Sequence, residues 1–242
     1  YGIENYDRAI VETLLTRKDL IDVVVPRGGD KLIAFVQKNS LMPIIKNDRG
    51  MCHAFVDESA DIDMAVKIVN NGKTQRPGVC NSLETVLVHE KAAEKFISKL
   101  FEATNSVNLE WHVDQKTLDI LKNKSRVKKA TDEDWNTEYL DQIINCKIVG
   151  SLDEAIAHIE KFGSKHSETI VTSSEKNARR FQDDVDAAAV YWNASTRFTD
   201  GFEFGLGGEL GISTQKLHVR GPVGLKELTT PRWIIDGTGQ IR

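Results

Sequence analysis

The chain has 242 residues, of which 40% are hydrophobic and 28% are charged, a normal balance for a folded globular protein. Lys and Arg total 32 against 36 Asp and Glu, so the net charge is −4, and no basic run is available to contact a nucleic-acid backbone. No stretch approaches the roughly 20 apolar residues that a membrane-spanning helix needs. The composition therefore argues against nucleic-acid and membrane partners and indicates a cytoplasmic protein.

Three cysteines, Cys52, Cys80 and Cys146, are spread along the chain without a C-x-x-C pair. An odd and dispersed set is typical of a reducing compartment with a reactive thiol, rather than of a disulfide framework. The chain begins at Tyr1 inside a segment of helical character, so we expect an N-terminal portion of the protein to precede it.

The first part of the chain alternates between strand and helix patterns. Residues 20–25 form a β-branched apolar run that predicts a strand, and residues 30–39 have helical spacing after a glycine turn. Short strands are expected at 43–45 and 52–56. Alternation of this kind predicts an α/β fold with a mostly parallel sheet flanked by helices.

A helix is predicted over residues 60–71, ending at Gly72, and a polar loop then leads to Cys80. The alternation continues with predicted helices at 91–101, 151–162 and 175–184, and predicted strands at 85–88, 107–112, 146–149, 169–171 and 189–192. Residues 122–134 are expected to form a solvated surface excursion. The last apolar run, 233–235, is predicted to be a strand that returns to a sheet.

Cys80 is the strongest candidate for a chemical role. It follows a turn rich in Gly and Pro, with Lys73 and Arg76 nearby in the sequence. Neighbouring cations favour the thiolate, which is the reactive form of cysteine. The alternative is a small buried apolar residue, as most free cysteines are.

Two further features suggest ligands. The turn Arg27-Gly28-Gly29 lies between a predicted strand and a helix, where backbone N–H groups can approach a phosphate. Because it lacks the G-x-G-x-x-G pattern, a purely structural turn is the alternative. His53 next to Cys52 suggests a metal pair, but zinc sites need about three or four spaced ligands, so a structural role is favoured and no metal is predicted.

Residues 193–201 form a loop dense in hydrogen-bonding side chains. Arg197 in this loop is suited to hold a carboxylate or phosphate through two hydrogen bonds. The alternative is a turn stabilised by its own Ser, Thr and Asp contacts. His166 lies in a polar loop between a predicted helix and a predicted strand, which is typical of binding sites and also of surface turns.

Several segments resemble gamma-glutamyl phosphate reductases, a family of the aldehyde dehydrogenase superfamily. They are residues 24–29 (VVPRGG), 73–85 (KTQRPGVCNSLET), 163–168 (GSKHSE), 191–198 (YWNASTRF) and 204–209 (FGLGGE). The resemblance implies three regions in an aldehyde dehydrogenase-like fold. These are the C-terminal part of a Rossmann-like nucleotide-binding domain (1–50), a catalytic domain (51–220) and an oligomerisation arm (221–242).

The same resemblance implies an activity. It is the NADPH-dependent reduction of L-glutamyl 5-phosphate to L-glutamate 5-semialdehyde and phosphate, the second step of proline biosynthesis from glutamate, through a thioester on Cys80. The residues implied for substrate binding are Lys73, Arg76, Asn81, His166, Asn193, Ser195, Arg197 and Thr199. Those implied for the cofactor are Arg27, Gly28, Gly29, Glu138 and Phe204. The implied partners are further copies of the protein, in a homo-oligomer, and glutamate 5-kinase, through a functional association.

One position departs from the wider superfamily. Asn47 stands where hydrolytic aldehyde dehydrogenases have a glutamate base, and an amide cannot activate water as a carboxylate does. The resemblance therefore favours phosphate as the partner of the thioester. Two alternatives remain: a coenzyme-A-acylating aldehyde dehydrogenase, and a fragment that folds and associates without catalysis.

Overall fold

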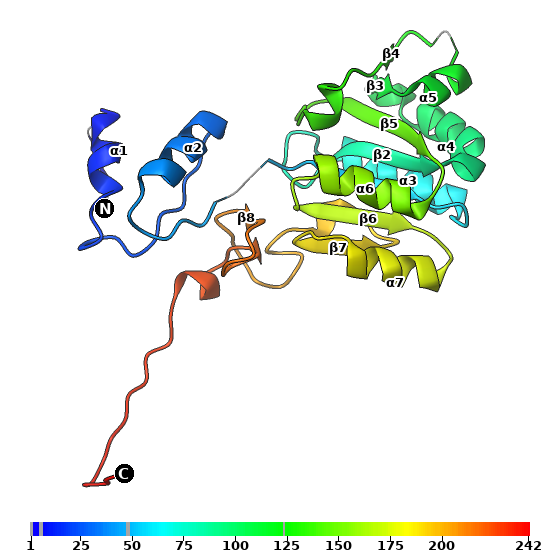
Figure 1. Cartoon of the computed structure of the whole chain (residues 1–242). Coiled ribbons are helices and arrows are strands. Elements are labelled where there is room, and N and C mark those ends of the chain that lie inside the picture. Colours follow the sequence, from blue (N-terminus) through cyan, green and yellow to red (C-terminus); the bar gives the residue numbers. More distant parts are fainter. Residues whose placement is uncertain (1, 5–6, 47–48, 123) are drawn as a thin grey trace.

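The computed structural model describes residues 2–4, 7–46, 49–122 and 124–242. Figure 1 shows α1 (Ala9–Leu14) and α2 (Asp30–Asn39) to one side of a larger α/β body, with the short strand β8 (Ile212–Ser213) beside that body. β8 pairs with β9 (Gly221–Pro222). Within the described ranges, no helix has the length and apolar character of a membrane span.

In the described part of the chain, seven strands form one sheet in the order β4-β3-β5-β2-β1-β6-β7. Their bounds are β1 Cys52–Val56, β2 Leu83–His89, β3 Glu110–Val113, β4 Val127–Lys129, β5 Ile143–Val149, β6 Ser167–Val171 and β7 Ala189–Trp192. Every neighbouring pair is parallel. The predicted α/β fold with a mostly parallel sheet is therefore confirmed.

Helices cover both faces of this sheet, as crossover connections between parallel strands require. They are α3 (Ile62–Thr74), α4 (Glu90–Ala103), α5 (Gln115–Ile120), α6 (Leu152–Phe162) and α7 (Glu175–Asp184). Side chains of β1, an inner strand between β2 and β6, alternate between two apolar cores. Ala54 and Val56 pack with α3 and α4, whereas Phe55 packs with α6 and α7. A strand covered on both faces is apolar throughout, which is why residues 52–56 could be recognised from the sequence.

The helix α3 continues two residues beyond the predicted end at Gly72. The glycine serves packing rather than termination, because a Cβ on Gly72 would lie 2.5 Å from the Leu83 side chain. As a result Lys73, expected in an exposed loop, lies on the helix and is buried. The predicted end of this helix was wrong, and the two additional residues of helix place the charged side chain of Lys73 in the interior.

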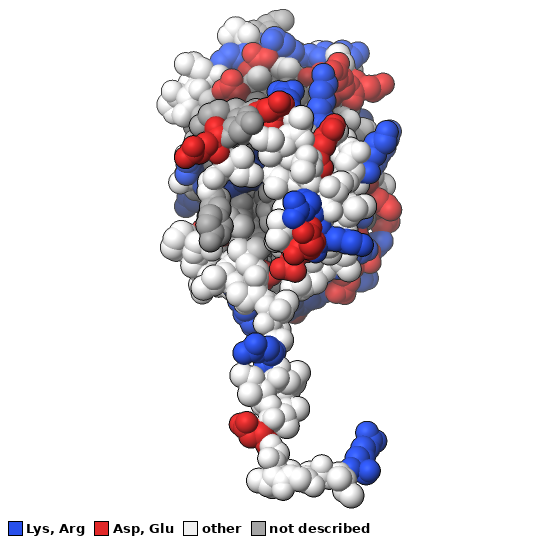
Figure 2. Space-filling view, turned by 90° about the vertical axis from the view of Figure 1, so that its left-hand side faces the viewer, with Lys and Arg blue, Asp and Glu red and all other residues white. Residues whose placement is uncertain are grey.

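The predicted strands at 20–25 and 43–45 are reduced to a single parallel bridge between Val24 and Ile44. Part of the predicted surface excursion is the edge strand β4, which pairs with β3. The predicted strand at 233–235 does not form within this chain: in the described residues it pairs with no other strand and is exposed. A strand requires a hydrogen-bonded neighbour, and the C-terminal segment runs away from the body (Figures 1 and 2).

Candidate active site

Cys80 lies in the connection between α3 and β2, on the side of the sheet where the N-terminal ends of the parallel strands lie. Cys52 is the first residue of β1, Ser167 is the first residue of β6, and Glu138 precedes β5. Because the N-terminal ends of parallel strands lie on one side of the sheet, these four residues from distant parts of the sequence gather there.

The backbone of Cys80 is held by close contacts. Gly50 packs against it so tightly that a Cβ on Gly50 would stand 1.7 Å from the Cys80 carbonyl oxygen. The thiol of Cys52 donates to that same oxygen at 3.3 Å. The Gly50 amide in turn donates to Glu138 Oε1 at 2.7 Å. Cys80 and Glu138 are therefore linked through Gly50.

Burial raises the pKa of the Cys80 thiol to about 11, and the carboxylates of Glu209 and Glu138 add to the effect, while the guanidinium of Arg197 opposes it. Lys73 and Arg76, which were expected to favour the thiolate, are not among the main influences on this pKa. The Lys73 ammonium is fully buried and pairs with Glu84 at 2.9 Å, so it is not available to a substrate.

The predicted binding loop is bonded to the residue after Cys80. Arg197 donates to the side chain of Asn81 and, at 2.9 Å, to Gln75 Oε1. Asn81 Nδ2 donates to the Thr199 carbonyl at 2.9 Å, and Thr196 Oγ1 donates to the Asn81 carbonyl at 2.7 Å. Arg197, Asn81 and Cys80 thus come together as expected. In the same loop, the hydroxyl of Ser195 accepts from the Arg197 amide at 3.3 Å.

His166 lies in the connection between α6 and β6, as expected, but it is buried rather than part of a surface turn. Its Nδ1 lies 2.7 Å from Ser167 Oγ and 3.7 Å from Cys52 Sγ. Ser167 Oγ lies 2.6 Å from Thr199 Oγ1, which lies 2.7 Å from the Tyr191 hydroxyl. Burial lowers the pKa of His166 to about 4, so its ring is neutral at physiological pH. This network lies behind Cys52.

Asn193 lies on the opposite side of the sheet, at the C-terminal ends of the strands. It follows β7, and its side chain bonds both the amide and the carbonyl of Thr172, which follows β6, at 2.9 and 3.0 Å. Strands of four or five residues, roughly 13–16 Å long, separate these C-terminal ends from Cys80. The geometry therefore gives Asn193 a structural function and corrects its expected place beside the substrate.

Three of the residues expected to bind the cofactor lie at the start of α2. Arg27 donates to the Leu210 carbonyl at 2.6 Å, which connects this turn to the residue after Glu209. Gly29 is the N-cap of α2, and a Cβ there would meet nothing within 4 Å. Nothing therefore crowds Gly29, and close approach of a phosphate to a helix N-terminus requires such open space. Of the other two residues expected to bind the cofactor, Glu138 lies beside Gly50 and Phe204 is exposed.

A cavity of about 500 Å³ lies next to Gly50, the residue that packs against Cys80. Its lining includes Arg49 and Met51, which flank Gly50, and five basic residues: Lys46, Arg49, Lys161, Lys165 and Lys216. Among the described residues that line it, none is acidic. Two of these basic residues, Lys165 and Lys216, pair with Asp186 at 2.7 and 3.0 Å, and none of the predicted site residues lines the cavity.

Sequence reasoning missed Cys52, Glu84 and Glu209 as members of this region. Glu84 and Glu209 lie in segments that carry the family resemblance, whereas Cys52 was considered only as a strand residue and as a possible metal partner of His53. His53 is buried and pairs with Glu168 at 3.1 Å. Across the described ranges, no three His, Cys, Asp or Glu side chains gather closely enough to bind a metal ion. Asn47 lies outside the described residues.

The comparisons with known proteins agree with this geometry. Gamma-glutamyl phosphate reductases of Caldicellulosiruptor saccharolyticus and Clostridium tetani are 54% and 52% identical over 99% of this chain. The chain spans 58% of the length of each. The crystal structure of gamma-glutamyl phosphate reductase from Thermotoga maritima superposes with a TM-score of 0.93 and 49% identity, covering 99% of this chain and 57% of that one.

An acetylating aldehyde dehydrogenase from Geobacillus thermoglucosidasius has the same fold, with a TM-score of 0.72 and 19% identity over 98% of this chain and 61% of that one. The expected resemblance to gamma-glutamyl phosphate reductases is therefore confirmed. The family pattern described as the aldehyde dehydrogenase family matches residues 7–133, more than half of the sequence, and the chain belongs to that family.

Proposed function

We propose that this chain carries the catalytic cysteine of an enzyme that reduces L-glutamyl 5-phosphate to L-glutamate 5-semialdehyde and phosphate. The observation that supports it best is the arrangement of Cys80 beside Arg197 and Glu138, in a chain 54% identical to a gamma-glutamyl phosphate reductase. Because the chain spans only 58% of that relative, the proposal concerns the full-length protein.

The proposed chemistry begins at the Cys80 sulfur. Once the thiol has lost its proton, the sulfur attacks the acyl carbon, a C–S bond forms, and the C–O bond to phosphate breaks, which leaves a thioester and free phosphate. Hydride addition to the thioester carbonyl is followed by cleavage of the C–S bond, which releases the semialdehyde and the thiolate. Arg197 and Asn81 are proposed to bind the anionic substrate next to the sulfur, together with the nearby Arg76, Ser195 and Thr199.

NADPH is the proposed cofactor, and when bound it supplies the hydride. The turn of Arg27, Gly28 and Gly29 is proposed to hold one of its phosphates at the start of α2. Glu138, which is linked to Cys80 through Gly50, is proposed to hold the ribose near the reacting carbon, and Phe204 is proposed to contact the same cofactor.

We infer three further features of the full-length protein. Three free cysteines, one of them proposed as a nucleophile, suit a reducing compartment, which favours the cytoplasm. The exposed side chains of Trp233, Ile234 and Ile235 suit an arm (residues 221–242) that pairs with another copy in a homo-oligomer. Glutamate 5-kinase, which would supply the acyl phosphate, is a proposed functional partner.

The test uses the full-length protein and follows oxidation of the semialdehyde by NADP⁺ with phosphate as the acyl acceptor. Cys80→Ser should abolish this activity, whereas Cys146→Ala, a change in the core remote from the site, should retain it. Turnover by the Cys80→Ser protein would disprove the assignment.

A second candidate is a coenzyme-A-acylating aldehyde dehydrogenase, since the acetylating aldehyde dehydrogenase above has the same fold. Replacing phosphate by coenzyme A in the same assay separates the two: the proposed enzyme turns over with phosphate and not with coenzyme A.

A further inference from the structure

We propose that Glu84 is a positioning residue for the cysteine centre, which uses one carboxylate oxygen to hold Lys73 and the other to hold the segment that carries Glu138 beside Cys80. This inference rests on the proposed function, because it assigns a purpose to groups around the same sulfur.

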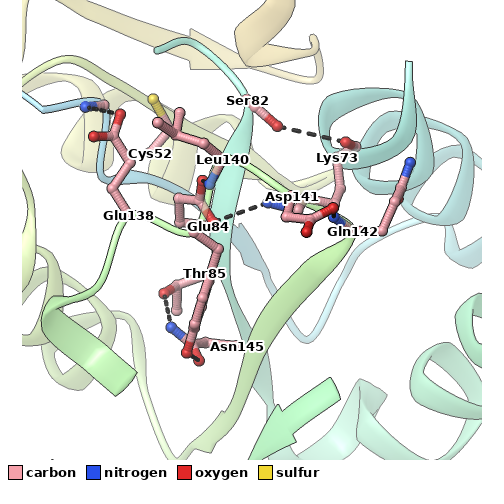
Figure 3. A network of polar contacts seen from close by, with 12 residues as sticks. Cys52, Lys73, Ser82, Glu84, Thr85, Glu138, Leu140, Asp141, Gln142 and Asn145 are labelled. Atoms are coloured by element: carbon pink, nitrogen blue, oxygen red, sulfur yellow. Dashed lines mark hydrogen bonds and ion pairs between the residues drawn. The ribbon is translucent and has the colours of Figure 1, made fainter. Parts of the chain in front are cut away.

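Both oxygens of Glu84 are used. Oε2 accepts from the Lys73 ammonium at 2.9 Å, and Oε1 accepts from the Leu140 amide at 3.3 Å. The side chains of Lys73 and Glu84 are 0% and 1% exposed. Figure 3 shows these residues converging from α3, from β2 and from the segment before β5. One buried carboxylate therefore joins three parts of the chain.

The segment held by Glu84 leads directly to Cys80. Leu140 has a φ of 55°, a left-handed conformation that is unusual for a leucine and needs support from its surroundings. Two residues earlier, Glu138 Oε1 accepts from the Gly50 amide at 2.7 Å. Gly50 packs on the Cys80 carbonyl. A shift of Leu140 would therefore be transmitted through Glu138 and Gly50 to the cysteine.

The other side of this segment has its own anchor. The Tyr139 hydroxyl lies 2.7 Å from Asp134 Oδ1 and 3.0 Å from Asn145 Oδ1. Asn145 Nδ2 donates to the Asp134 carbonyl at 2.7 Å. These contacts hold the residues before Leu140 on β5, so the interaction with Glu84 is the complementary restraint from β2.

The pair also supports the turn that contains Cys80. Ser82, two residues after the cysteine, directs its hydroxyl to the carbonyls of Gly72 and Lys73 at 3.3 and 3.4 Å. The last turn of α3, which carries Lys73, is thus bonded to the start of the strand that carries Glu84. Cys80 lies in the loop closed by these contacts.

Stability alone is a poor reason for a buried ion pair. Burial raises the pKa of Glu84 to about 7 and lowers that of Lys73, while their mutual attraction opposes both changes. Well-packed apolar residues often replace such pairs at little or no cost. The second oxygen of Glu84, which holds Leu140, gives the pair a use that an apolar pair lacks.

The experiment compares two double variants of the full-length protein. Lys73→Met with Glu84→Gln removes the ion pair but keeps an oxygen for the Leu140 amide, and Lys73→Met with Glu84→Leu removes both. We expect the Leu variant to have a kcat lower by about tenfold to a hundredfold and a raised KM for NADP⁺, with the semialdehyde KM changed by less than about twofold. The Gln variant should stay near the wild type.

A double-mutant cycle tests whether Glu84 acts through Glu138. In a Glu138→Ala background, the difference between the Gln and Leu variants should disappear, because the transmitting group has been removed. Equal kcat values for the two folded variants would overturn the proposal, and so would a difference that persists without Glu138.

Two measurements on the chain itself keep the inference separate from the proposed activity. The rate at which iodoacetamide alkylates Cys80 should differ from the wild-type rate in the Leu variant and equal it in the Gln variant. This holds whether or not the full-length protein reduces the acyl phosphate. If the Leu variant does not fold, hydrogen exchange of wild-type residues 137–141 decides. Protection of the Leu140 amide comparable to that of β2 supports the proposal, and exchange as fast as in an open loop contradicts it.

Discussion

Gly50 lies directly against Cys80: a Cβ built on Gly50 would be 1.7 Å from the Cys80 carbonyl oxygen and 2.5 Å from its Cα. The requirement for glycine at this position comes from close approach of two backbone segments. The strand entry at residue 50 therefore determines where the cysteine backbone can lie.

We predict that Gly50→Ala displaces the Cys80 loop and lowers kcat of the full-length protein by about a hundredfold, the order of loss that follows from misplacing a reacting group by about 1 Å. Gly150→Ala is the matched control, because its Cβ would make ordinary contact, at 3.6 Å, with Glu154. Similar kcat values for the two variants would show that the close approach has no effect on the site.

The reactivity of Cys80 should depend on pH in a defined direction. With the pKa raised to about 11, the thiol is protonated at neutral pH, so the rate of alkylation should rise about tenfold per pH unit up to that value. Glu209→Gln removes a negative charge and should shift the profile to lower pH, whereas Arg197→Ala should shift it to higher pH. A rate that becomes constant below pH 9 in the wild-type chain is incompatible with this environment.

Breaking the buried pair from one side should be costly. Glu84→Ala leaves the Lys73 ammonium unpaired in the interior, and we expect a loss of about 3–5 kcal/mol in the free energy of unfolding. Lys73→Met combined with Glu84→Leu should recover most of that loss. Urea denaturation measures both values, and equal destabilisation by the single and double changes would mean that the charges do not interact.

The two ends of the strands should respond differently to substitution. Arg197→Ala, at the N-terminal ends beside Cys80, should raise KM for the semialdehyde or lower kcat/KM. Asn193→Ala, at the C-terminal ends, should destabilise the fold by about 1–3 kcal/mol through the unpaired groups of Thr172 and leave KM unchanged. Steady-state kinetics with thermal unfolding separates the effects. A raised KM for the Asn193 variant would contradict its placement.

The sequence was sufficient for the fold because the strands at 52–56, 85–88 and 189–192 are covered on both faces or lie within a regular alternation with helices. It was also sufficient to bring Cys80, Asn81 and Arg197 together, because their segments resemble those of one family. The strand predictions depend on local patterns that are visible in a single window of the chain, whereas the grouping of the three site residues depends on agreement across several segments.

The electrostatics of the site could not be predicted in this way. Lys73 is close to Cys80 in the sequence, but two additional residues of helix turn it toward Glu84. Glu209 and Glu138, which act on the thiol, are distant in the sequence and come close only in the folded chain. His166 is a loop residue, as predicted, but its packing against Cys52 buries it, which the loop pattern does not reveal.

The central claim is that Cys80 forms the covalent intermediate. The most direct measurement is to incubate the full-length protein with the semialdehyde and NADP⁺ in the absence of phosphate, quench it with acid, and map the modified peptide by mass spectrometry. We predict a glutamyl adduct on Cys80, with Cys52 and Cys146 unmodified. An adduct on another residue, or turnover without any adduct on Cys80, would contradict the account.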